Sequence, residues 1–427
     1  MREENLKTKY LIIGAGVTGL SFANFIKDNY LIIEKENEVG GFCRTIYKND
    51  YVWDYAGHFF HFSNDKIKKY FLNSINKDEL VFKEKNTKIY CCNTFVDYPF
   101  QKNIHQLPKN DFINCLYDLF NKTEKEKYTG FLDMLFGKFG KSITSYFLQP
   151  YNEKLYACDL NKLDVDAMGR FFPYADVKDI INNMKNTDNS SYNNSFLYPK
   201  KGAKVFIDRL LTNIDKEKLF LDEEIINIDI DRKIAYTSKN KKIEYEILIN
   251  TSPFSNFLEY FRGKYQNILQ NFTYNKVLVF NLGFDKKSDT KDLHWLYLPD
   301  KNINFYRIGF YDNILDSDKL SMYIEIGFSK DEKIDVKKEL ENTLESLKKL
   351  NIITNHKLCA YSIIIMEPAY VHISKNSNEL KEKIKKELEE NNIYTIGRYG
   401  DWKYCSIEDS VIDSLKLSEK LLNMENK

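Results

Sequence analysis

Short apolar runs, a glycine turn and helical spacing follow one another at the start of this chain. KYLIIGAGVTGLSFANFI (9–26) reads as a buried strand, a glycine turn and a helix, and YLIIEK (30–35) reads as a second strand. The glycines are Gly14, Gly16 and Gly19, and Glu34 follows about 20 residues after the first of them. This spacing is typical of a dinucleotide-binding unit, in which the acidic residue binds a ribose hydroxyl.

The periodicity changes twice further along the chain. Residues 108–184 carry apolar positions at helical spacing and predict several helices. The polar stretch KNTDNSSYNNS (185–195) has almost no apolar residue, and we expect a mobile loop there. It is either a surface loop without a function or a flap over a pocket. Residues 268–330 and 358–374 alternate between apolar and polar positions and predict an antiparallel sheet.

Three segments point to FAD rather than NAD. EVGGFCRT adds Gly40, Gly41, Arg44 and Thr45 directly after the predicted ribose-binding acid. This run resembles the extended phosphate-binding motif of the FAD-dependent amine-oxidase and protoporphyrinogen-oxidase superfamily. YEILINTSP (245–253) resembles a later strand of that superfamily, and Arg398, before a closing helix, resembles the segment that completes the flavin site.

These elements predict an α/β fold with a Rossmann-like FAD-binding domain, an inserted helical domain and an antiparallel β-sheet domain. The expected boundaries are 1–75, 196–260 and 390–427 for the FAD-binding domain, 108–195 for a helical nucleotide-binding domain, and 76–107 with 261–389 for the substrate sheet.

Composition narrows the function classes. The chain has 63 basic and 62 acidic residues, so it lacks the charge excess of a nucleic-acid or membrane-surface protein. Its apolar runs are interrupted by polar residues, and the charged N-terminus MREENLKTKY leads straight into a strand, so we expect neither a membrane span nor a signal peptide. The seven cysteines are scattered without a CxxC pair, which favours the cytoplasm and argues against a metal site.

DYPFQKNIHQLP (97–108) carries the most specific candidate chemistry. Tyr98, Phe100 and Gln101 surround a proline. Aromatic faces beside a side-chain amide suit a flat polar ring, whose edge the amide can read. The alternative is that both aromatic residues belong to the core.

VDYPFQKNIHQLP, FLQPYNEKLYACD, HWLYLPDKNINFYRIGFYDN and GRYGDWKY follow one another on this scaffold. Together they resemble the UDP-galactopyranose mutase family, closest to its eukaryotic-type branch. The resemblance departs at Tyr156, where the family has Trp, and at Ile314, where it has Tyr. The tail after the last motif is closer to bacterial forms.

The resemblance implies a role for each matching residue. Arg307 and Arg170, two of only eight arginines, would bind the diphosphate as catalytic residues, and His58 would shape the flavin face. The implied substrate-binding residues are Tyr98, Phe100, Gln101, Asn152, Tyr156, Asn193, Tyr297, Tyr370 and Tyr404. The implied cofactor-binding residues are Gly14, Gly16, Gly19, Glu34, Gly40, Gly41, Arg44, Thr45 and Arg398.

The reaction that the resemblance implies is an isomerisation of the sugar ring, from pyranose to furanose, with no net redox change. FAD, reduced by NAD(P)H or another reductant, would attack the anomeric carbon of a UDP-sugar through N5 and displace UDP. The sugar ring would then open, reclose through a different hydroxyl as a furanose and recombine with UDP, which releases the flavin. An FAD-dependent oxidase of the amine-oxidase type and a non-catalytic flavoprotein that binds a nucleotide sugar remain alternatives. The sugar (galactose, an N-acetyl or a deoxy analogue) and homo-oligomerisation stay open.

Overall fold

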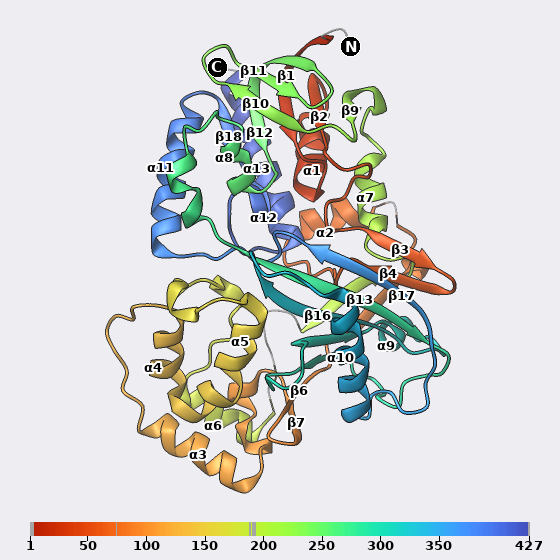
Figure 1. Ribbon diagram of the computed structural model, residues 1–427, viewed down its shortest axis with the longest axis vertical. Coiled ribbons are helices and arrows are strands. Elements are labelled where there is room, and N and C mark those ends of the chain that lie inside the picture. Colours follow the sequence, from red (N-terminus) through yellow and green to blue (C-terminus); the bar gives the residue numbers. More distant parts are fainter. Residues whose placement is uncertain (1–3, 74, 188, 190–193, 426–427) are drawn as a thin grey trace.

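Two seven-stranded sheets and a helical unit make up the computed structural model, which describes residues 4–73, 75–187, 189 and 194–425 (Figure 1). The first sheet lies at the end of the molecule that carries both termini, and the helical unit packs at the other end beside the second sheet. The α/β fold class predicted from the sequence is confirmed.

The first sheet is mostly parallel, and its strands come from three separated segments. β1 pairs in parallel with β2 and β12, and β12 pairs in parallel with β18. The order is β10-β11-β12-β1-β2-β9, with β18 on the free half of β12. The strands are β1 (Glu4–Ile13), β2 (Tyr30–Ile33), β9 (Leu219–Phe220), β10 (Ile225–Asp229), β11 (Ile234–Thr237), β12 (Lys241–Asn250) and β18 (Ile393–Thr395).

Helix α1 (Val17–Ile26) is buried on nearly every side because it lies between this sheet and α13 (Ile407–Glu425). The Ser414 hydroxyl of α13 donates to the carbonyl oxygen of Thr18 at 2.9 Å. A Cβ on Gly19 would lie 2.0 Å from the carbonyl oxygen of Gly14, so only glycine lets the helix begin this close to the turn. The glycine pattern therefore sets the packing of the first βαβ unit.

The second sheet has the order β17-β13-β16-β15-β14-β6-β7 and is antiparallel except at one place. β14 and β6 pair in parallel, because β6 reaches the sheet from a distant part of the chain. The sequence predicted an antiparallel sheet and did not indicate this pair. The strands are β6 (Thr87–Cys91), β7 (Thr94–Asp97), β13 (Asn275–Phe284), β14 (Trp295–Tyr297), β15 (Arg307–Phe310), β16 (Ser321–Ser329) and β17 (Leu358–Met366).

The helical unit follows β6 and β7 in the chain, precedes the other strands of the second sheet and packs beside that sheet (Figure 1). Its helices are α3 (Lys109–Phe120), α4 (Phe131–Ile143), α5 (Gln149–Tyr156) and α6 (Val177–Lys185). The predicted mobile loop begins where α6 ends, but positions 188 and 190–193, including Asn193, lie outside the described residues. In the described part of the chain, every helix is too short or too polar to cross a membrane.

The remaining elements connect these units. Two small antiparallel sheets are formed by β3 (Thr45–Lys48) with β4 (Tyr51–Asp54), and by β5 (Leu80–Glu84) with β8 (Ser195–Pro199). The other helices are α2 (Asp65–Leu72), α7 (Lys204–Leu211), α8 (Phe254–Glu259), α9 (Tyr311–Leu315), α10 (Val336–Lys349), α11 (Lys375–Glu389) and α12 (Gly397–Gly400).

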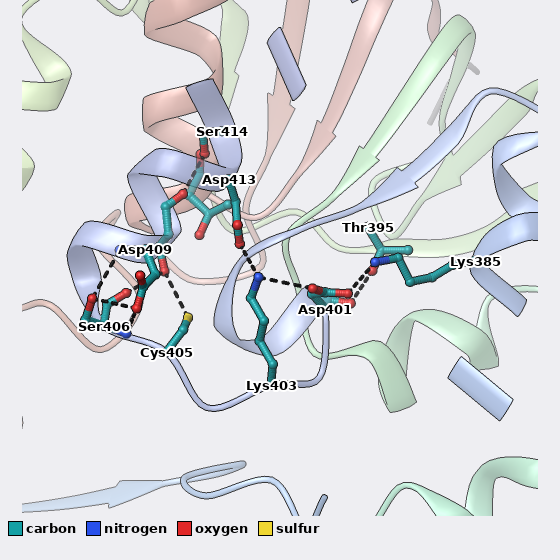
Figure 2. A network of polar contacts seen from close by, with 12 residues as sticks. Lys385, Thr395, Asp401, Lys403, Cys405, Ser406, Asp409, Asp413 and Ser414 are labelled. Atoms are coloured by element: carbon teal, nitrogen blue, oxygen red, sulfur yellow. Dashed lines mark hydrogen bonds and ion pairs between the residues drawn. The ribbon is translucent and has the colours of Figure 1, made fainter. Parts of the chain in front are cut away.

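A partly buried ion network anchors the segment after β18, as Figure 2 shows. Asp401 lies 2.5 Å from the Lys385 ammonium of α11 and 3.1 Å from that of Lys403, which in turn reaches Asp413 of α13 at 2.7 Å. Burial alone would raise the pKa of Asp401, but Lys385, Lys381 and Lys403 outweigh it and hold the pKa below its usual value. The network thus ties α11, α12 and α13 together around residues 397–404.

We predict that Asp401→Asn lowers the free energy of unfolding by about 3 kcal/mol at pH 7, because it leaves buried lysines without their anion. The native pKa of Asp401 is below its unfolded value, so its contribution is present at neutral pH and is lost as the pH falls below about 4. Urea unfolding at pH 7 and at pH 3.5 measures both effects.

Asp28→Asn is the matched control, since Asp28 pairs with Lys218 on the exposed surface. Its unfolding curve should stay close to that of the wild type. Equal curves for wild type and Asp401→Asn at pH 7 would contradict the anchoring role.

Candidate functional site

A cavity of about 200 Å³ lies between the helical unit and the second sheet. One wall comes from α5 and the segment 168–173, and the other from β14, β15, Tyr370 and Tyr404. The lining side chains are Lys85, Tyr98, Gln101, Phe147, Leu148, Tyr151, Asn152, Leu155, Met168, Arg170, Phe171, Phe172, Pro173, Tyr297, Arg307, Tyr370 and Tyr404. Most of the predicted substrate-binding residues therefore meet in one place.

Two amide oxygens are left without a partner at one end of this cavity. The Gln101 amide nitrogen donates to the carbonyl oxygen of Pro173, and that of Asn152 donates to the carbonyl oxygen of Leu148 at 2.6 Å. Since carbonyl oxygens only accept, these bonds orient both amides and leave Gln101 Oε1 and Asn152 Oδ1 buried and unpaired within the described chain. This end suits a ring that presents an N–H edge, as a pyrimidine base does.

The aromatic residues predicted around this end separate into two groups. Tyr98 lines the cavity, and its ring meets Tyr297 edge-on at 5.5 Å. Phe100 does not line it: the side chain is fully buried and packs against Phe147 at 5.1 Å, so the core alternative holds for this residue. Tyr156 is also in the core, with its ring 6.0 Å from Tyr370. Within the YPFQ segment, Tyr98 and Gln101 thus face the cavity, whereas Phe100 faces the core.

The register of β14, β15 and β16 brings Arg307 and its partners together at the cavity. Tyr297 of β14 is paired with Arg307 of β15, which is paired with Glu325 of β16. Glu325 is buried and binds both Nε and Nη2 of Arg307, at 2.6 and 2.5 Å. Arg307 Nη2 also donates to the Tyr370 hydroxyl at 3.4 Å. The guanidinium is held rigidly at the cavity, as bidentate anion binding requires.

Arg170 reaches the cavity from the opposite side and is half exposed. Its Nη2 lies 2.6 Å from Asp409 at the start of α13. Beside it, the rings of Tyr370 and Tyr404 stack at 5.9 Å, with the Arg398 guanidinium 4.6 Å from the Tyr404 ring. The cavity therefore carries arginine charge on both sides, with tyrosine rings between them.

The structure contains a backbone cradle that fits a dinucleotide. Gly14 has φ 98°, and a Cβ built on Gly16, the residue before α1, would meet nothing within 4 Å. A Cβ on Gly41 would first meet the Cα of Gly16, at 3.7 Å. Glu34 is buried and accepts from the backbone N–H of Ala15 at 2.7 Å, which fixes its carboxylate beside the turn. These residues fit a pyrophosphate and a ribose.

Three predicted cofactor residues make structural contacts around this cradle. Arg44 donates to the carbonyl oxygens of Glu38 and Val39, which closes the loop that carries Gly40. The Thr45 hydroxyl donates to Asp54 at 2.7 Å. Arg398 donates to the carbonyl oxygen of Cys405 at 2.9 Å and so braces the turn that begins at Gly397.

His58 is held as a neutral imidazole. Burial, together with the positive charges of Arg398 and Arg307, lowers the pKa of His58 to about 4. Its Nδ1–H donates to the carbonyl oxygen of Ala56 at 3.0 Å, which leaves Nε2 as an acceptor. At neutral pH the ring therefore adds no positive charge to the site.

Lys85, Tyr151 and Glu325 were not among the predicted site residues. Tyr151 stacks on Tyr297 at 5.1 Å, and it is the residue just before the predicted Asn152. Glu325 stands alone in the otherwise apolar run SMYIEIGF, and that lone acid was a usable signal. Lys85 is one of many lysines, so the sequence offered no way to select it.

Comparison with known proteins extends these observations. Residues 12–73 match the model of an NAD(P)-binding Rossmann-like domain. Reduced UDP-galactopyranose mutase superimposes with a TM-score of 0.92 at 24% identity, covering 99% of this chain and 95% of that one.

More distant matches include the CLA-producing fatty acid isomerase from P. acnes, with a TM-score of 0.67 at 12% identity over 97% of this chain and 98% of that one. Wild-type putrescine oxidase bound to putrescine matches with a TM-score of 0.66 at 9% identity, over 98% of this chain and all of that one. The resemblance predicted from the motifs is thus confirmed for the architecture as a whole: the chain has the fold of UDP-galactopyranose mutase, within the wider flavoenzyme fold.

Proposed function

We propose that the protein is an FAD-dependent nucleotide-sugar mutase that interconverts UDP-galactopyranose and UDP-galactofuranose, or a close analogue. The observation that carries this proposal is the cavity, which joins two unpaired amide acceptors at one end to arginine and tyrosine side chains at the other. A generic flavin oxidase needs neither end. The likeness to UDP-galactopyranose mutase over 99% of the chain supports the same assignment.

In this proposal, one group of residues binds the base of the substrate and another group binds its diphosphate. Gln101 and Asn152 accept from the N–H edge of the base, and Tyr98 packs on the ring face. Arg307 and Arg170 bind the diphosphate, with the hydroxyls of Tyr297, Tyr370 and Tyr404 as further donors. The helical segment 108–195 then contributes Asn152 to the base end and Arg170 to the anion end, and the second sheet contributes Tyr297 and Arg307 to the anion end.

FAD, once reduced by NAD(P)H or another reductant, would supply the nucleophile for the anomeric carbon of the sugar. The chain itself would orient the sugar, exclude water with the aromatic walls and stabilise the departing diphosphate. His58, held neutral, keeps the face of the cofactor site free of an additional cation. The physiological setting that we propose is the cytoplasm.

A turnover assay tests the reaction. Dithionite-reduced protein and an oxidised control are incubated with UDP-galactopyranose or UDP-galactofuranose, and the products are separated by chromatography. Interconversion that occurs only in the reduced sample would support both the mutase reaction and galactose as an accepted sugar. Tight UDP binding without interconversion keeps the nucleotide site and rejects galactose as the sugar.

The second candidate is an FAD-dependent oxidase, favoured by the likeness to putrescine oxidase. An amine substrate would then bleach the flavin absorption, whereas UDP would only perturb it. Bleaching by an amine, with no effect of UDP, would contradict the mutase proposal.

We predict that Arg307→Ala weakens UDP binding about 100-fold while FAD stays bound. The loss is large because the substitution also leaves Glu325 as an uncompensated carboxylate facing the diphosphate. The double variant Arg307→Ala/Glu325→Gln should recover part of the affinity. Calorimetry with UDP and the flavin absorption spectrum measure the two effects.

The exposed Arg262, whose Nε donates to Asn227, provides the control. Arg262→Ala should bind UDP like the wild type. Unchanged UDP affinity in Arg307→Ala would remove the diphosphate assignment.

We predict that Asn152→Leu weakens UDP binding about tenfold and leaves pyrophosphate binding unchanged, because it removes one acceptor for the base. Gln149→Leu on the same helix is the control, since this amide donates to Glu153 and does not line the cavity. Competition of UDP and of pyrophosphate against a fluorescent UDP analogue gives both affinities. Equal weakening of the two ligands by Asn152→Leu would count against a base site here.

A further inference from the structure

Lys85 stands out among the cations of this cavity. It follows β5, and its backbone N–H donates to the carbonyl oxygen of Asn194 at 2.8 Å. Its ammonium lies 4.6 Å from the centroid of the Tyr98 ring and 5.8 Å from that of Trp295, so the side chain extends along the cavity wall. Aromatic faces attract the ammonium but do not neutralise its charge.

The charge of Lys85 has no anionic counterpart in the described part of the chain. The neighbouring lysines in β5 and β6 are paired: Lys83 with Asp316 at 2.9 Å, and Lys88 with Asp97. Arg307 and Arg170, the other two cations of the cavity lining, are paired with Glu325 and Asp409. The described lining includes no aspartate or glutamate that could serve Lys85.

The surroundings of Lys85 disfavour its charge while the cavity holds no anion. Burial, together with the nearby Arg307, lowers the pKa of the Lys85 ammonium to about 8. The other titratable groups that face it are His61 and Tyr98. Burial lowers the pKa of His61 to about 4 and raises that of Tyr98, so neither changes its charge near pH 8. A bound anion would restore the full charge of Lys85.

The position of Lys85 indicates which part of the ligand meets it. The base end is marked by Gln101 and Asn152, whereas Lys85 shares the opposite wall with Arg307. Trp295, beside Lys85, packs on Phe59 at 4.9 Å, and Phe59 directly follows His58. Lys85 therefore lies on the Arg307 side of the Tyr98 ring, beside Trp295.

We propose that Lys85 binds the distal phosphate of the nucleoside diphosphate, as a third cation beside Arg307 and Arg170. This inference rests on the proposed function, since it takes a nucleoside diphosphate as the ligand. The charges of the two arginines are already balanced by Glu325 and Asp409. The ammonium of Lys85 is therefore the positive charge that a bound phosphate would balance. The distal phosphate also bears the sugar, which makes Lys85 a determinant of recognition next to the reacting bond.

Comparison of UDP with UMP isolates the distal phosphate. The holoenzyme and its Lys85→Met and Lys85→Arg variants are titrated with both nucleotides by calorimetry. Lys85→Met should lose about tenfold to a hundredfold in UDP affinity but less than about threefold in UMP affinity, while Lys85→Arg keeps UDP affinity within a few-fold. Lys83→Met, whose lysine is already paired with Asp316, should match the wild type.

Proton uptake provides a readout that a merely structural role would not change. The pKa of Lys85 is about 8 in the free protein and rises when the phosphate binds, so wild-type UDP binding takes up protons at pH 8 and weakens as the pH rises to 9. The diphosphate of UDP is already fully ionised at pH 8, so it takes up no proton on binding. Titrations in two buffers of different ionisation enthalpy should show uptake in the wild type and none in Lys85→Met or Lys85→Arg.

Each outcome decides a separate point. Absence of UDP binding to the wild type would overturn the proposed function, and with it the anion site. Wild-type binding that Lys85→Met leaves unchanged would overturn the assignment of Lys85 alone. Equal losses for UDP and UMP would also overturn it, since Lys85 would then not act at the distal phosphate. Flavin spectra and thermal midpoints establish that each variant is folded.

Discussion

The site depends on how closely helix α5 docks against strand β16. A Cβ on Gly327 of β16 would lie 2.1 Å from the carbonyl oxygen of Lys154, so the helix backbone rests directly on the strand. The Lys154 ammonium donates to the carbonyl oxygens of Leu298 and Asp300, both at 2.9 Å, and the Asn275 amide of β13 donates to that of Leu155 at 2.6 Å. Because the cavity lies between α5 and β14–β15, this contact sets the distance between the base end and the anion end.

Charge in the cavity is arranged before any ligand arrives. A guanidinium that is largely removed from water is costly unless it is paired, and Glu325 offsets this cost for Arg307. Asp409 pairs with the half-exposed Arg170 and holds its side chain in place. Side chains that are already oriented lose little conformational freedom when an anion binds. Lys85 has no such partner among the residues that the structure describes, so part of the electrostatic complement of the cavity is left for the ligand to supply.

The segment after β18 contributes in a similar way to the wall that carries Tyr370 and Tyr404. Asp401 gathers lysines from α11 and from its own turn, and Lys403 carries the network on to Asp413 of α13. Arg398 and Tyr404 lie within this turn, and Tyr404 lines the cavity. Helices far from the cavity thereby determine the position of side chains that face it.

Much of the fold and part of the site could be predicted from local pattern. The first βαβ unit follows from consecutive residues, since the turn at Gly14, the entry into α1 and the position of Glu34 are all set within a few turns of chain. Local pattern could not tell that Tyr98 faces the cavity while Phe100, two residues on, faces the core. That choice depends on Phe147, a residue of the helical unit.

The sequence by itself therefore determined the types of element, the dinucleotide turn and most of the candidate side chains that line the cavity. Only the tertiary structure decided the parallel pairing of β14 with β6, the partnership of Arg307 with Glu325 and the selection of Lys85 among so many lysines. The physical reason is the range of the interactions. Helical and strand periodicity is encoded over a few residues, whereas strand register and buried charge depend on segments that meet only after the chain has folded.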